Sequence, residues 1–123
     1  MKIHESGENY LETILILKQR LANVRSIDVA NELNYTKPSV SVAMKQFRQN
    51  GLISIDDNGF ISLTDEGFKI ANRVYNRHTL LIKALIHLGV SEKTAKEDAC
   101  RLEHDISDET FDKLKEFCEK YNI

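Results

Sequence analysis

The sequence predicts a mainly α-helical fold with one small β-hairpin. Through most of the chain, apolar residues recur every three or four positions, which is the periodicity of amphipathic helices. The exception is a pair of β-rich runs at 52–55 and 60–63, which flank a loop containing the Asn58-Gly59 turn signal. Two short helical segments joined by a turn at 34–36 come directly before these runs. Together these observations predict a winged helix-turn-helix in the N-terminal part, followed by further helices.

Composition places the chain among ordinary globular proteins. Its 123 residues suit one compact domain or two small lobes that share a core, and 41% of them are hydrophobic and 29% charged. The longest apolar run, 14–17, is too short to span a bilayer, and no signal-peptide segment opens the chain. We therefore expect a cytoplasmic protein without a membrane partner, in which Cys100 and Cys118 are free thiols or metal ligands.

Charge is divided unevenly along the chain. Residues 1–90 contain 11 Lys and Arg against 9 Asp and Glu, a balance of +2, whereas residues 91–123 contain 6 against 10, a balance of −4. An acidic C-terminal third is a poor partner for polyanions. Any nucleic-acid binding is therefore predicted to lie before residue 90.

The first three helices are predicted from their apolar stripes and end signals. The first covers 8–21, with Tyr10, Ile14, Leu17 and Leu21 inward. Ser26 is predicted to cap the second, and the third has Pro38 in its first turn and stops at Gly51. The inward stripe of the third helix is Val40, Ala43, Met44 and Phe47, and its outward face carries Ser39, Ser41, Lys45, Gln46 and Arg48.

A helix-turn-helix followed at once by a hairpin predicts a winged helix that binds double-stranded DNA. The third helix would then be the recognition helix. Lys37, Lys45 and Arg48 are candidate contacts to DNA phosphates, and Gln46 is a candidate reader of base edges. A plain helical hairpin is the alternative for the helix pair alone.

A long helix is predicted over 65–88, capped by Thr64. Its inward stripe is Ala71, Val74, Tyr75, Leu81, Ile82, Leu85 and Leu88. His78 fills the one gap in this stripe, so its imidazole should point toward the core or a neighbouring helix, while His87 should be solvated. A lone inward histidine is usually a hydrogen-bonded core residue, but a second ligand cluster in the same chain favours a metal ligand.

That second cluster lies on a helix capped by Ser91. Cys100, Glu103 and His104 stand at i, i+3 and i+4, so a thiolate, a carboxylate and an imidazole leave one face of the helix. Sulfur and nitrogen donors suit a transition metal better than calcium or magnesium. The alternative is a small buried thiol beside an exposed Glu/His pair. A last helix starts at Asp108, with Cys118 predicted to be a core residue.

With these residues placed, the chain resembles the diphtheria-toxin-repressor family of metal-dependent bacterial repressors, which includes iron-dependent and manganese-dependent regulators. The resemblance covers essentially the whole chain. It is carried by the segments 9–12 (Asn-Tyr-Leu-Glu), 37–41 (Lys-Pro-Ser-Val-Ser), 77–78 (Arg-His) and 99–104 (Ala-Cys-Arg-Leu-Glu-His). The Cys-x-x-Glu-His spacing is its most specific motif.

The resemblance implies a homodimeric repressor of operator DNA that responds to Fe(II) or Mn(II). It implies a winged-helix DNA-binding domain over 1–73 and a helical metal-binding and dimerisation domain over 74–123, which share the long helix. The metal ligands would be Glu12, His78, Cys100, Glu103 and His104. Ser39 and Ser41 would contact DNA phosphates or base edges.

Three departures from the family pattern bear on the metal. Asn9 stands where the family has Met or Asp, so that position offers a weak amide ligand. Ile82 and Lys96 stand where iron-type members place ligands of an ancillary site, which is expected to be lost or rebuilt. The chain ends at Ile123 without the SH3-like third domain of some members, as in the short manganese-type architecture, while its cysteine ligand is of the iron type.

Two other functions are compatible with parts of the pattern. One is a metal-independent winged-helix regulator in which the Cys/His cluster is structural. The other is an enzyme that uses Cys100 with His104 or His78. The chain has no obvious oxyanion loop or substrate pocket, so we expect a regulator that is not an enzyme and has no small organic substrate.

Overall fold

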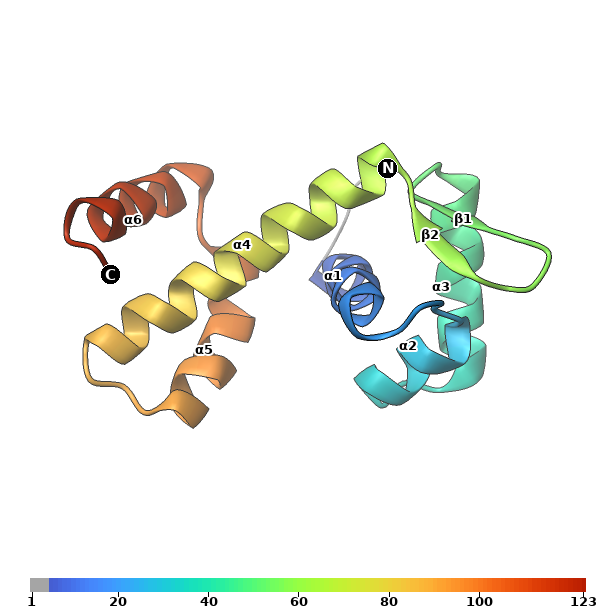
Figure 1. The fold of residues 1–123 in the computed structure, drawn as a ribbon, viewed down its shortest axis with the longest axis horizontal. Coiled ribbons are helices and arrows are strands. Elements are labelled where there is room, and N and C mark those ends of the chain that lie inside the picture. The colour runs from blue at the N-terminus through green and yellow to red at the C-terminus, as the bar shows by residue number, and fades with distance from the viewer. Residues whose placement is uncertain (1–4) are drawn as a thin grey trace. The chain divides into compact units, whose positions relative to one another are not determined.

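The computed structural model describes residues 5–123 and has the predicted fold class, six helices and one two-stranded antiparallel hairpin (Figure 1). The chain divides into two compact units, Met1–Arg73 and Val74–Ile123. The long helix α4, Asp65–His87, belongs to both units, because the boundary falls within it. Among the described residues, no helix combines the length and apolarity that a membrane span requires.

The N-terminal unit is a winged helix. It contains α1 (Glu5–Arg20), α2 (Ser26–Leu33), α3 (Lys37–Gln49), β1 (Ile53–Ile55), β2 (Ile61–Leu63) and the first part of α4. Its core takes apolar side chains from each of the three helices and from β2. The fully buried members include Leu11, Ile14, Val29, Val40, Met44 and Ile61.

The turn between α2 and α3 uses a left-handed residue. Asn34 has φ 56°, and Asn is one of the few side chains that adopt this conformation at modest cost. Its N–H and that of Tyr35 both donate to the carbonyl oxygen of Ala30, which closes the end of α2. At the other end of α2, the predicted cap Ser26 is wrong by one residue. Arg25 is the N-cap, and its N–H donates to the carboxylate of Asp28 at 2.9 Å.

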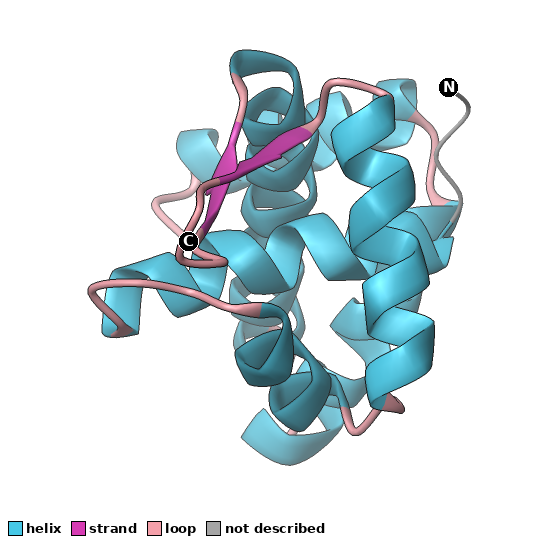
Figure 2. Ribbon diagram, turned by 90° about the vertical axis from the view of Figure 1, so that its right-hand side faces the viewer, coloured by secondary structure: helices cyan, strands magenta, loops and turns pink. Residues whose placement is uncertain are grey.

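The wing is a short antiparallel hairpin, and Figure 2 shows its two strands in magenta. Ser54 pairs with Ser62 at its centre, and Gly59 has φ 80° in the loop. The N–H of Ile61 donates to the carbonyl of Val24 at 2.7 Å, so the segment before α2 lies along β2. The predicted strands were each one residue too long at the N-terminal end.

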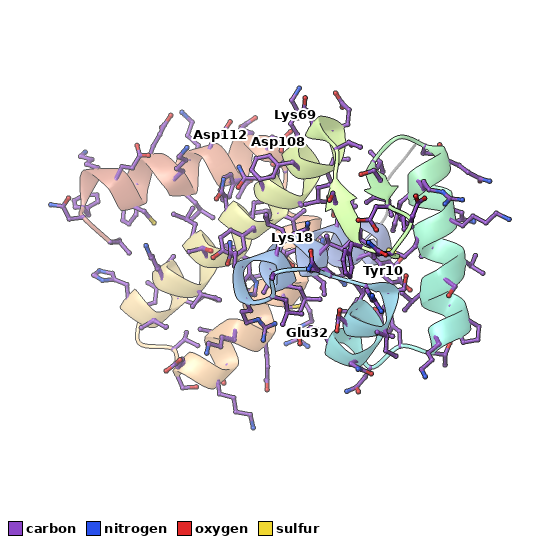
Figure 3. The ribbon with its side chains drawn as sticks, turned by 45° about the vertical axis from the view of Figure 1, so that its right-hand side comes forward. Tyr10, Lys18, Glu32, Lys69, Asp108 and Asp112 are labelled. Carbon is purple, nitrogen blue, oxygen red and sulfur yellow. The ribbon has the colours of Figure 1, made fainter. Side chains whose placement is uncertain are left out.

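Three aromatic rings join α1 to the helix-turn-helix. The Tyr10 ring, on α1 and labelled in Figure 3, packs edge-on against Tyr35 in the turn and Phe47 on α3, with centroid distances of 5.4 and 5.8 Å. Burial raises the pKa of the Tyr10 hydroxyl, and the nearby Tyr35 raises it further. The side chain is therefore neutral at ordinary pH and functions as a core residue.

The C-terminal unit is built from the rest of α4, α5 (Glu92–Asp105) and α6 (Asp108–Lys120). Ser91 and Ser107 cap α5 and α6 by accepting from the Thr94 and Thr110 N–H groups. The buried apolar side chains are Val74, Leu81, Ala95, Ala99 and Cys118, so the prediction that Cys118 is a core residue is confirmed.

Two predicted inward positions lie at helix ends and are exposed. Leu88 is 78% exposed and Leu21 is 38% exposed. Each follows the last residue of its helix, His87 for α4 and Arg20 for α1, so the helical periodicity no longer directs it toward the core. His87 is exposed, as predicted.

Candidate metal centre and nucleic-acid interface

The solvent-facing side of α3 carries the side chains predicted to bind DNA. The helix starts where Thr36 Oγ1 accepts a hydrogen bond from the Ser39 N–H at 3.3 Å. Val40, Met44 and Phe47 are buried. The opposite side of the helix therefore faces solvent, and all six predicted contacts are exposed, namely Lys37, Ser39, Ser41, Lys45, Gln46 and Arg48.

The cations of this surface make no ion pair with any residue that the structure describes. Within residues 5–123, Lys37, Lys45 and Arg48 have no carboxylate within ion-pair distance. Elsewhere in the unit, some basic side chains are paired: Arg20 pairs with Glu32 at 2.7 Å and Arg73 with Glu8 at 2.9 Å. The unpaired positive charge of the unit thus includes that of α3, where a polyanion can use it.

The wing itself carries no basic residue. Its turn contains Asp56 and Asp57, and no Lys or Arg occurs in 53–63. Two cations from outside the wing reach it: Lys18 Nζ donates to Ser62 Oγ at 3.3 Å, and the Arg25 guanidinium lies 4.8 Å from the centre of the Phe60 ring. Any phosphate contact on the wing side of the unit would therefore have to come from residues that flank the wing.

Two imidazoles and one carboxylate meet in the C-terminal unit. The Glu103 side chain, in the last turn of α5, is fully buried. Its Oε2 lies 2.7 Å from Nδ1 of His78 on α4, and its Oε1 lies 3.2 Å from Nε2 of His104. The His104 side chain is 2% exposed and that of His78 is 26% exposed. The packing of α4 on α5 thus brings together three of the five predicted ligands.

This cluster fits a divalent transition metal ion. A buried carboxylate is unfavourable unless hydrogen bonds or a cation compensate its charge. Glu103 Oε1 is buried and accepts no hydrogen bond of regular geometry from residues 5–123, although His104 Nε2 is near. An acceptor without a donor, flanked by two imidazoles, is suited to a metal ion.

Cys100 lies on the same helical turn but is exposed. The alternative of a buried thiol beside an exposed Glu/His pair is therefore wrong, because the thiol is exposed and Glu103 is buried. Cys100 forms no disulfide with Cys118. Cys100 thus lies three residues before Glu103 on α5, at an exposed position.

The predicted ligands of the first helix belong to the N-terminal unit. Glu12 is 7% exposed on α1, and Asn9 is half-buried. A carboxylate that served only as a solvated surface charge would be exposed, whereas Glu12 is buried. At the two positions of the ancillary site, Ile82 has no ligand atom, and Lys96 Nζ pairs with Glu92 at 3.0 Å.

One buried residue of this region was missed by sequence reasoning. Arg77 is 4% exposed, although arginine is rarely buried unless it is paired. It donates to the carbonyl oxygens of Glu103 and Ile106 at the end of α5 and to the carboxylate of Asp108. The sequence did contain a signal for this burial, because Arg77 stands three residues after Val74 and four before Leu81, within the inward stripe of α4.

A winged helix with an exposed basic recognition helix, followed by a helical unit with a buried His-carboxylate-His cluster, defines a DNA-binding regulator with a metal-binding part. Comparison with protein families agrees. The N-terminal DNA-binding domain of the iron-dependent repressors matches residues 2–59, and their metal-binding and dimerisation domain matches residues 64–122.

Relatives match over nearly the whole chain. A helix-turn-helix-type transcriptional regulator of Methanocaldococcus jannaschii is 35% identical over 119 residues, which is 95% of each chain. The transcriptional regulator MntR of Escherichia coli is 33% identical over 114 residues, or 93% of this chain and 74% of MntR. The crystal structure of the metal-dependent transcriptional regulator MtsR is 28% identical, with a TM-score of 0.85 over 92% of this chain and 53% of that one.

The chain belongs to the iron-dependent repressor family, whose members are metal-dependent transcriptional regulators. It spans about half the length of the MtsR chain. The resemblance drawn from the motifs at 9–12, 37–41, 77–78 and 99–104 is confirmed.

Proposed function

We propose that this protein is a homodimeric repressor that binds operator DNA when Fe(II) or Mn(II) is bound. The observation that carries the proposal is the fully buried Glu103 carboxylate between the imidazoles of His78 and His104. Membership of the iron-dependent repressor family supports both halves of the proposal, because the matched family domains are a DNA-binding domain and a metal-binding and dimerisation domain.

The proposed ligands are His78, Glu103 and His104, together with Cys100 and Glu12. Asn9 offers at most a weak amide oxygen. Glu103 and His104 are held by the last turn of α5, and His78 is held by the continuous helix α4. When bound, the ion supplies positive charge for the buried carboxylate and directional bonds to its ligands.

The proposed link between metal and DNA is a ligand set drawn from both units. Glu12 lies on α1 of the winged helix, two residues after Tyr10, whose ring packs against Phe47 of α3. The other four ligands lie on α4 and α5. A ligand set shared in this way would make DNA binding by α3 depend on whether the metal site is filled.

At the DNA, we propose that Lys37, Lys45 and Arg48 contact phosphates. Ser39, Ser41 and Gln46 would contact phosphates or base edges. Two recognition helices of a homodimer enter successive major grooves about 34 Å apart, so the operator is expected to be an inverted repeat with that spacing.

The test is titration of an operator fragment with apo protein and with protein loaded anaerobically with Mn(II) or Fe(II). Coupling between two sites is typically about 1–3 kcal/mol, so metal should raise operator affinity about 5–150-fold. A chelator should reverse the gain. Equal affinity with and without metal would refute the metal switch and leave a metal-independent winged-helix regulator.

A further inference from the structure

Two consecutive residues of α4 hold opposite ends of Glu103. His78 Nδ1 lies 2.7 Å from the Glu103 carboxylate, and Arg77 Nη1 donates to the Glu103 carbonyl oxygen at 3.2 Å. Neighbouring helical residues point in directions about 100° apart, so one segment of α4 can contact both the backbone and the side chain of the same residue. The position of Glu103 is therefore set by α4 as well as by its own helix.

The end of α5 needs this support, because the last four carbonyl groups of a helix have no partner within the helix. Glu103 and His104 lie in that last turn, which ends at Asp105. The Leu102 carbonyl accepts from the Ile106 N–H at 3.2 Å. Arg77 donates hydrogen bonds to two further carbonyl oxygens at this end, that of Glu103 and that of Ile106, the latter at 2.9 Å.

Arg77 is itself fixed from the other side. Its Nη2 donates to the carboxylate of Asp108, in the first turn of α6, which Figure 3 labels. The guanidinium also lies 5.3 Å from the centre of the Phe111 ring. One arginine thus joins α4, the end of α5 and the start of α6.

Stability alone is a weak explanation for this arginine. The Arg77 side chain is buried, but that of its partner Asp108 is 76% exposed, and ion pairs that reach solvent contribute little to stability. In addition, Arg77 Nε is buried and makes no hydrogen bond to the part of the chain that the structure describes. What Arg77 provides, and an apolar side chain would not, is direct hydrogen bonding to the backbone of the turn that carries Glu103 and His104.

We propose that Arg77 is the positioning residue of the metal centre, which keeps the Glu103 carboxylate directed at the ion by holding the Glu103 carbonyl. This inference rests on the proposed metal-binding function. It extends the site to a residue that is not a ligand, through contacts that lie entirely within the C-terminal unit.

The experiment compares Arg77→Met, Arg77→Lys and Asp108→Asn in the full chain. Mn(II) affinity is measured by electron paramagnetic resonance of the free ion, and stability by thermal unfolding of the apo protein. Loss of an outer-shell partner typically weakens metal binding about 10–100-fold, which is the loss expected for Arg77→Met. Arg77→Lys keeps the charge and one donor, so it should recover part of the affinity.

Asp108→Asn is the control. It weakens the ion pair between Arg77 and the start of α6 but leaves the hydrogen bond from Arg77 to the Glu103 carbonyl. Its loss of affinity should be smaller than that of Arg77→Met at comparable loss of apo stability. If Arg77→Met does not fold, Arg77→Lys must bind Mn(II) more weakly than Asp108→Asn.

Two outcomes overturn the inference, and they are distinguishable. If folded Arg77→Met binds Mn(II) as tightly as the wild type, or if Arg77→Lys binds at least as tightly as Asp108→Asn, Arg77 is only structural and the proposed function stands. If the wild-type protein binds neither Mn(II) nor Fe(II), the proposed function fails, and this inference fails with it.

Discussion

At the scale of single residues, the proposed metal site depends most on the side chain of Glu103. Its carboxylate is fully buried, and the ring nitrogens within reach belong to His78 and His104. Burial makes an uncompensated negative charge expensive, whereas a metal ion makes the same charge favourable. Removing the charge of this residue therefore tests the proposed metal sensor against a regulator with a structural Cys/His cluster.

Glu103→Gln keeps the size of the side chain and removes its charge. We expect a loss of Mn(II) affinity at least as large as the roughly 10–100-fold typical of outer-shell changes, because a proposed ligand itself is altered. Operator affinity should stay at its metal-free level when metal is added, as measured by fluorescence anisotropy of labelled DNA.

The matched control is Glu97→Gln, the same substitution at an exposed position of α5. It should bind metal and DNA as the wild type does. Retention of a metal-stimulated increase in operator binding by Glu103→Gln would contradict the assignment of Glu103 as a ligand.

At the scale of elements, the contact between α4 and the residue before β1 is unusually close. A Cβ added at Gly67 would lie 1.9 Å from the carbonyl oxygen of Leu52. The N–H of Gly67 also donates to Thr64 Oγ1 at 3.2 Å, and Thr64 in turn donates to the Gly51 carbonyl at 2.6 Å. Glycine thus allows the start of α4 to lie against the backbone that leads into the wing.

Gly67→Ala is therefore expected to destabilise the protein, although alanine is normally favoured over glycine in a helix by about 0.5–1 kcal/mol. The added methyl group would clash with the Leu52 backbone, which cannot change rotamer as a side chain can. Overpacking of this kind lowers the free energy of unfolding by about 1–3 kcal/mol. Urea unfolding of the apo protein measures the difference. Glu66→Ala, at an exposed position in the same turn, should change stability little; a stabilised Gly67→Ala would refute the close approach.

At the scale of the whole molecule, the net charge of −2 is compatible with DNA binding because the positive and negative charges lie in different parts of the chain. The balance of +2 before residue 90 includes the exposed cations of α3, while the −4 after it lies mainly on α5 and α6. Long-range repulsion between acidic segments and DNA is screened within about 8 Å at physiological ionic strength, whereas direct contacts to phosphates are retained.

This distribution predicts how substitutions change the salt dependence of DNA binding. Lys45→Ala should weaken binding to all sequences and lower the slope of log affinity against log salt by about 1. Gln46→Ala should leave the slope unchanged. The control is Lys69→Ala, which removes an exposed cation of α4 that lies 3.8 Å from Glu66. An unchanged slope for Lys45→Ala would exclude Lys45 as a phosphate contact.

Much of the fold and part of the candidate site followed from sequence. The helices, the hairpin and the solvent-facing side of α3 were predictable because they depend on local periodicity, capping and turn signals. The exposure of Lys45 and Gln46 follows directly from the burial of Val40, Met44 and Phe47 on the other side of the same helix. Errors were confined to ends, such as Ser26 as a cap and Leu21 and Leu88 as core residues.

Only the tertiary structure decided which side chains of the metal region are buried. Helical spacing places Cys100, Glu103 and His104 on one turn, but it cannot tell which of them faces α4. The packing of α5 on α4 buries Glu103 beside His78, leaves Cys100 exposed and encloses Arg77. The physical reason is that periodicity is a property of one helix, whereas burial and pairing depend on a second helix distant in the sequence.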